Sequence, residues 1–159
     1  MCKLMSGYLV VLLVSVSLPQ TAEKVDFSGS YTLTGTKGEV KLEKETKWSL
    51  KVVQSPSAIK VTKTMNSLVE SHTYPLDGSE GDYVSSFGGH GTCKGQLKGK
   101  LLRLESVVNP HGLPNDQVYK TERWELSPDA KKLTIRIEGG FNDMSLGRKQ
   151  FWSEIYTRD

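Results

Sequence analysis

The sequence predicts an all-β fold, a single antiparallel meander barrel of about eight to ten strands. Apolar and polar residues alternate with a period of two over much of the chain, as in strands with one buried and one solvated face. Turn-forming pairs such as Asp77-Gly78 and Asn109-Pro110 recur at short intervals, and no long helical segment intervenes. The length of 159 residues suits one domain.

The first 22 residues have the features of an export signal. Lys3 and the amino terminus place positive charge ahead of an apolar run from Tyr8 to Leu18, and a polar segment ending at Ala22 follows. The run is shorter than the roughly 20 apolar residues of a membrane span. We therefore expect a mature domain of residues 23–159, secreted or periplasmic, with no stable membrane span after cleavage. An uncleaved interfacial anchor is the alternative.

The mature chain is nearly neutral, because removal of residues 1–22 leaves 20 basic against 18 acidic side chains. A nucleic-acid partner is not expected, since binding of that kind needs a concentrated basic face with aromatic residues. Cys93 is then the sole cysteine, so no internal disulfide can form. We interpret it as a small buried apolar residue, with an intermolecular bridge or a reactive thiol as alternatives.

The alternation assigns strands along the mature chain, from Phe27 to Thr157. In the clearest hairpin, Trp124 and Leu126 point one way while Arg123 and Glu125 point the other, and residues 127–130 form the turn. Lys63 interrupts the apolar face of its strand. Residues 38–47 are expected as an exposed loop or strand, with a short helix as the alternative. The expected strands are 27–33, 48–52, 59–65, 99–108, the 122–139 hairpin and 151–157, and the longest loops are 77–82, 87–92, 109–116 and 139–147.

The stretch DFSGSYTL, residues 26–33, resembles the opening strand of lipocalin-like barrels, where a Gly-x-Trp element begins the first strand. More broadly, the chain resembles small exported bacterial proteins of unknown function that share the turn at 74–78, the hairpin at 122–129 and the closing strand at 153–156. Tyr31 stands where the tryptophan would be, and Arg158 occupies the place of the late arginine that packs near it in lipocalins. The resemblance implies a calycin-like barrel that can enclose a cavity, without implying a ligand.

The best candidates for chemistry are His90 and Cys93 in the glycine-rich stretch FGGHGTC, as a nucleophile pair or as two metal ligands. A third group to orient the base is missing, and a structural zinc site needs four ligands. The carboxylates of residues 77–82 do not match the calcium-loop spacing. Glu122 and Glu125 should lie on opposite strand faces, which prevents them from flanking one glycosidic bond. We therefore expect no catalytic activity, cofactor or metal, and an enzyme centred on His90 and Cys93 is the third-ranked hypothesis.

The leading functional hypothesis is an exported protein that binds a small, largely apolar ligand inside a lipocalin-like barrel. Aromatic and aliphatic residues on inward strand faces can either fill a core or line such a cavity. The alternative is an extracytoplasmic protein-interaction or inhibitor module acting through its loops, with residues 109–116 as the best candidate surface. The predicted cavity residues are Tyr31, Trp48, Leu50, Leu104, Trp124 and Ile135.

Overall fold

The structure is a computed structural model that describes residues 25–38, 47–86, 88–109, 117–141 and 149–159. These residues form ten strands and no helix, which confirms the predicted all-β class and strand number. The predicted export signal at residues 1–22 lies outside the described residues. So do residues 39–46 and most of the predicted loops 109–116 and 139–147. The strands are β1 (Gly29–Gly38), β2 (Trp48–Gln54), β3 (Ala58–Met65), β4 (Leu68–Pro75), β5 (Gly81–Val84), β6 (His90–Lys98), β7 (Leu101–Asn109), β8 (Val118–Leu126), β9 (Lys132–Phe141) and β10 (Gln150–Arg158).

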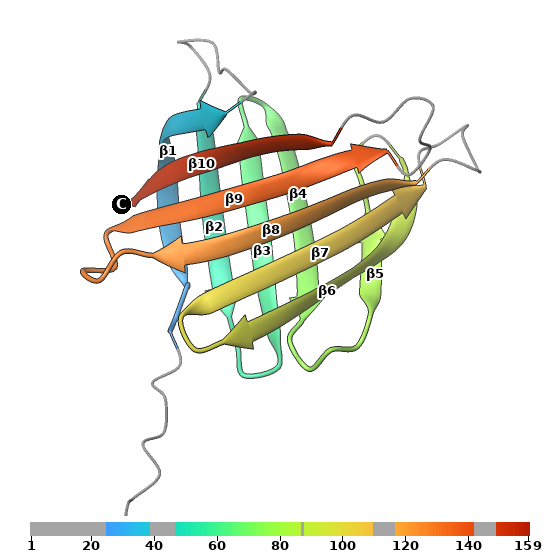
Figure 1. Ribbon diagram of the computed structural model, residues 1–159, viewed down its shortest axis with the longest axis horizontal. Coiled ribbons are helices and arrows are strands. Elements are labelled where there is room, and N and C mark those ends of the chain that lie inside the picture. Colours follow the sequence, from blue (N-terminus) through green and yellow to red (C-terminus); the bar gives the residue numbers. More distant parts are fainter. Residues whose placement is uncertain (1–24, 39–46, 87, 110–116, 142–148) are drawn as a thin grey trace, which may run out of the picture.

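All ten strands belong to one antiparallel sheet in the order β4-β3-β2-β1-β10-β9-β8-β7-β6-β5. Apart from the β1–β10 pair, every neighbour in the sheet is also a neighbour in the chain, so the fold is a meander whose first and last strands join. The sheet folds over itself so that β1–β4 form a layer behind β6–β10, and the two layers cross steeply (Figure 1). The strands β4 and β5 meet where the barrel would close, but share no ladder pairs. We call this line the β4–β5 seam.

The pairing of β1 with β10 ties the two ends of the domain together. Tyr31 lies opposite Arg158 in the register, and the Arg158 Nη2 donates hydrogen bonds to the Tyr31 hydroxyl at 2.8 Å and to the Ser28 carbonyl at 2.7 Å. The guanidinium carbon lies 5.2 Å from the centroid of the Tyr31 ring. The packing of a late arginine against the first strand, implied by the lipocalin resemblance, is therefore confirmed.

The glycine-rich segment at residues 87–92 is less of a loop than its sequence predicts, because β6 already begins at His90. A side chain at Gly91 would overlap the Val107 carbonyl oxygen on the neighbouring strand. Glycine is required there for close approach of two strands, not for a turn. The predicted loop at 77–82 is likewise shortened, since β5 starts at Gly81. The strands β4, β5 and most of β6 were not predicted.

The core fills the inside of the barrel and consists of inward side chains from both layers. Trp124 is fully buried, and its ring meets the ring of Phe27 edge to face at a centroid distance of 6.3 Å. Two carboxylates, Glu122 and Glu154, are buried among these apolar groups. None of the described residues belongs to a helix long and apolar enough to cross a membrane. The core side chains with no exposed surface are Phe27, Tyr31, Ile59, Leu102, Trp124, Leu133 and Tyr156.

Candidate functional site

Inward side chains of β2, β3 and β4 form rows across the barrel wall, because antiparallel register places them opposite one another. The outermost row is apolar and partly exposed, the next contains two charged groups, and the third ends in a histidine. The wall therefore changes from apolar to polar just inside the rim. The rows are Trp48–Met65–Leu68, Leu50–Lys63–Glu70 and Val52–Val61–His72.

The facing wall is formed by β6 to β10 and carries a second set of inward charged groups, opposite those of the first wall. Glu122 lies between Ile137 and Leu104 in one row, and Glu154 shares the next row with Ile135 and Trp124. Lys120 lies in the row on the other side of Glu122. Charged side chains from both walls thus project into one interior region.

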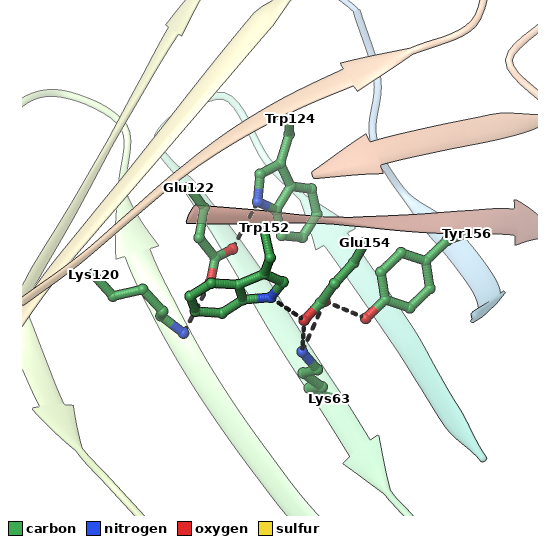
Figure 2. Close-up of polar contacts among 7 residues, drawn as sticks. All are labelled: Lys63, Lys120, Glu122, Trp124, Trp152, Glu154 and Tyr156. Atoms are coloured by element: carbon green, nitrogen blue, oxygen red, sulfur yellow. Dashed lines mark hydrogen bonds and ion pairs between the residues drawn. The ribbon is translucent and has the colours of Figure 1, made fainter. Parts of the chain in front are cut away.

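Lys63 reaches across the barrel to Glu154 (Figure 2). The Lys63 ammonium lies 2.9 and 2.8 Å from the two Glu154 carboxylate oxygens, and the same carboxylate accepts hydrogen bonds from the Trp152 indole at 3.2 Å and the Tyr156 hydroxyl at 2.7 Å. The ammonium also lies 4.3 Å from the centroid of the Trp48 ring. Glu154 is only 2% exposed, so these four donated bonds replace the water that it loses on folding.

Glu122 forms a second ion pair beside the first, in which the carboxylate is buried and the Lys120 side chain is 33% exposed (Figure 2). Its carboxylate lies 2.8 Å from the Lys120 ammonium and accepts a hydrogen bond from the Trp124 indole at 2.7 Å. Burial pushes the pKa of Glu122 upward, but the Lys120 charge and these hydrogen bonds outweigh burial and leave the pKa below its usual value. Burial opposes the charged form of Lys120 too, yet Glu122 holds the Lys120 pKa well above its usual value. Both partners therefore stay ionised.

His72 and Glu70 complete the polar group on the β4 side. The imidazole stacks on the Tyr83 ring of β5 at a centroid distance of 3.9 Å and an interplanar angle of 13°. Its Nε2 is buried and has no hydrogen-bond partner among the described residues. Burial lowers the pKa of His72 below the ordinary value, so the ring is neutral at pH 7. Glu70 accepts a hydrogen bond from the Ser86 hydroxyl.

These groups surround a small interior cavity of about 30 Å³. A space of this size holds about one water molecule, which would satisfy the orphaned Nε2 of His72. The cavity lies between the two barrel walls and has both apolar and charged lining. Its polar lining includes the phenol of Tyr74, and the charged or imidazole side chains that line it are Lys63, Glu70, His72, Lys120, Glu122 and Glu154.

Three of the six predicted cavity residues, Leu50, Trp124 and Ile135, line this cavity. Tyr31 and Leu104 are buried but belong to the packed core away from it, and Trp48 lies partly exposed at the rim. The charged lining was not predicted. Its signal was present in the alternation, because Lys120 and Glu122 have the same parity as the buried Trp124 on one strand.

His90 and Cys93 do not form a catalytic pair. They lie on opposite faces of β6, with His90 exposed and Cys93 buried. The Cys93 thiol is 3.4 Å from the Thr73 carbonyl and 3.6 Å from the Asp82 carbonyl, and burial raises the thiol pKa. Within the described ranges, no group of three or more His, Cys, Asp or Glu side chains could hold a metal ion.

Glu122 and Glu125 point to opposite faces of β8, as predicted. Glu122 is inside the barrel, whereas Glu125 is exposed and lies 3.0 Å from the Arg136 guanidinium. The two carboxylates therefore cannot act on one substrate bond.

The outer surface carries a larger hollow of about 340 Å³ over β8, β9, β10 and the end of β1. Lys37, Arg123 and Arg136 supply three positive charges to it against the one carboxylate of Glu138, and Phe151 beside them is 53% exposed. It is an open groove on the outer wall, separate from the barrel interior.

No protein-family model and no curated protein matches the sequence. Solved structures match the fold. One, described as "REP1-NXSQ fatty acid transporter", is 11% identical with a TM-score of 0.56, over 83% of this chain and 95% of that chain. Another, fatty-acid-binding protein 1 of Echinococcus granulosus, is 10% identical with a TM-score of 0.57, over 83% of this chain and 96% of that chain. These likenesses show that the chain shares the barrel fold of these structures, in agreement with the barrel implied by the resemblance of the first strand.

Proposed function

We propose that the protein is an exported binding protein that takes a small, largely apolar ligand into its barrel. The observation that carries the proposal is the polar cluster around the interior cavity. Buried ion pairs are often replaceable by apolar residues without loss of stability, so a core does not need them for folding. Convergent polar groups within an apolar enclosure are typical of small-molecule sites, where they orient the ligand.

The cavity must widen to admit such a ligand, since sites for drug-sized molecules measure about 300–1,000 Å³. The β4–β5 seam is where widening is easiest, because no ladder pairs join these strands. Side chains hold β4 there instead. Glu70 accepts from Ser86, His72 stacks on Tyr83, and the Thr73 carbonyl accepts from the Cys93 thiol. A ligand that parts the seam would disturb these side-chain contacts and leave the rest of the sheet paired.

The rim beside the seam is suited to an apolar molecule. Leu68 and Val69 at the start of β4 are 39% and 59% exposed, and Val84 at the end of β5 is 51% exposed. The antiparallel run of the two strands brings these ends together, as the Ser86–Glu70 contact shows. Two of the solved structures that share the fold are named for fatty acids, which supports an apolar ligand without identifying it.

Native mass spectrometry of the mature protein, purified gently from the exported fraction of its own host, tests the proposal. We expect a species heavier than the bare chain by a few hundred daltons, with the extra mass lost on denaturation. The mass of the mature chain would also report cleavage near Ala22. A bare chain from the host, together with no saturable binding of any apolar probe by the purified protein, would rule the proposal out.

The outer groove supports a second candidate, a protein-interaction module. Its three cationic side chains outnumber the single Glu138 carboxylate, and together with the exposed Phe151 they would suit an acidic partner segment with an apolar anchor. The loop at residues 109–116, predicted as the interaction surface, lies mostly outside the described residues. Replacing Arg123 and Arg136 by Glu separates the two candidates, because it would abolish a partner contact at the groove and leave interior ligand binding unchanged.

A further inference from the structure

We propose that the interior site selects a ligand whose polar end is uncharged and both donates and accepts hydrogen bonds, such as a hydroxyl or a primary amide. The groups that hold it are Glu70, His72 and Lys120. The inference rests on the proposed function and adds to it the chemistry of the ligand's polar end.

The charges around the cavity disfavour an anionic ligand. Three carboxylates, Glu70, Glu122 and Glu154, line it against two ammonium groups, Lys63 and Lys120. Lys63 is already bound to both oxygens of Glu154, and Lys120 to Glu122. A fatty-acid carboxylate would enter beside three existing negative charges and would have to compete with Glu122 for Lys120. Burying an ion without a free counter-ion costs several kcal/mol.

A cationic ligand is disfavoured for the matching reason. Every oxygen of Glu122 and Glu154, the two cavity carboxylates of the β8–β10 wall, already accepts from a donor of the protein, and four bonds reach Glu154. The charge of each is also already balanced by a lysine, Lys120 or Lys63. His72 provides no counter-charge either, because an imidazole is neutral or cationic and never negative in a protein of this kind. An amine placed among these groups would repel Lys120 while gaining at most the one oxygen of Glu70 that has no partner in the described part of the chain.

The unused hydrogen-bonding capacity matches a neutral polar group. Among the described residues, Lys120 has one ion-pair contact for its three N–H donors, and Glu70 has one hydrogen bond, from Ser86, for its two oxygens. His72 Nε2 is buried without a partner among the described residues. A hydroxyl can accept from Lys120 and donate to Glu70 or His72 at once, so it satisfies groups on both sides of the cavity without adding charge.

The test is direct binding of three molecules with the same hydrocarbon chain, dodecanol, dodecanoate and dodecylamine, to the mature protein at neutral pH. We expect dodecanol to bind roughly tenfold or more tightly than either ion, because only the ions must be desolvated as charges. Equal or tighter binding of dodecanoate or dodecylamine would overturn the neutral-end inference while leaving interior binding intact. If none of the three bound saturably, the proposed function would fail and this inference with it.

Matched variants locate the preference within the site. His72→Phe keeps a ring against Tyr83 but removes Nε2, so we expect it to weaken dodecanol binding several-fold and to change dodecanoate binding little. His90→Phe alters an exposed histidine on the outer face of β6 and should leave the order of affinities unchanged. An unchanged preference for dodecanol in His72→Phe would contradict the assignment of this residue to the polar end.

Discussion

Removal of the Lys63 side-chain charge provides the sharpest test of the interior ion pairs. In Lys63→Met, a side chain of similar length and apolar character replaces the lysine, so the packing beside Trp48 is largely kept. The Glu154 carboxylate, 2% exposed, then loses its counter-ion while it retains the hydrogen bonds from Trp152 and Tyr156. An uncompensated carboxylate in the core destabilises the folded state.

The magnitude follows from the burial of the two partners. Breaking a buried ion pair by removal of one partner costs about 3–5 kcal/mol. Lys63 keeps 22% of its surface exposed and Glu154 keeps two other donors, which reduces the effect. We expect the free energy of unfolding to fall by about 2–3 kcal/mol, which lowers the urea midpoint by roughly 1–1.5 M for a domain of this size.

Urea unfolding at neutral pH, followed by tryptophan fluorescence, measures this loss. Arg136→Met is the control, since the Arg136–Glu125 pair is exposed and its removal should cost about 0–1 kcal/mol. The double variant Lys63→Met/Glu154→Gln should recover more than half of the loss, because the buried charge is then absent. The reasoning is refuted if Lys63→Met costs no more than Arg136→Met.

Three further predictions concern single positions. Burial depresses the pKa of His72, so at mildly acidic pH the unfolded chain binds a proton that the folded chain does not. The free energy of unfolding should therefore fall as pH drops below about 6.5, which urea midpoints at several pH values would show. His72→Phe should abolish this pH dependence, and His90→Phe should leave it unchanged. Gly99→Ala should destabilise by about 1 kcal/mol, because Gly99 has φ +56° with open space around it; a thermal melt with no change would contradict this. In a chain lacking Cys2, the Cys93 thiol should react with a thiol reagent only after denaturant is added, and rapid labelling of the folded protein would show that it is accessible.

Period-two alternation was sufficient to predict the all-β class. It shows which side chains of a strand face inward, and this does not depend on knowing which other strand lies beside it. The hairpin at 122–139 was therefore placed correctly, with Trp124 inside and Glu125 outside. The contact between Tyr31 and Arg158 was also anticipated, from the resemblance of the first strand. Both features depend on local pattern or on the position of a single residue.

The charged cluster could not be predicted in the same way, because it depends on strands that are remote in the sequence. Lys63 and Glu154 are 91 residues apart and meet only because the two layers of the sheet face each other. The inward parity of Lys120 and Glu122 was visible, but a charge at an inward position is unusual and was not treated as a site. The glycines of β6 were mistaken for a loop, because sequence alone does not distinguish a turn from a close approach of two backbones.

The central claim, that the barrel interior receives the ligand, is tested most directly by NMR of the tryptophan indole N–H groups during titration with dodecanol. The three tryptophans, Trp48, Trp124 and Trp152, all lie on inward strand faces, and two of them donate to the buried carboxylates. We predict saturable shifts of the Trp124 and Trp152 indole signals with one common dissociation constant. Saturable binding that leaves both indole signals unmoved would place the ligand outside the barrel and contradict the claim.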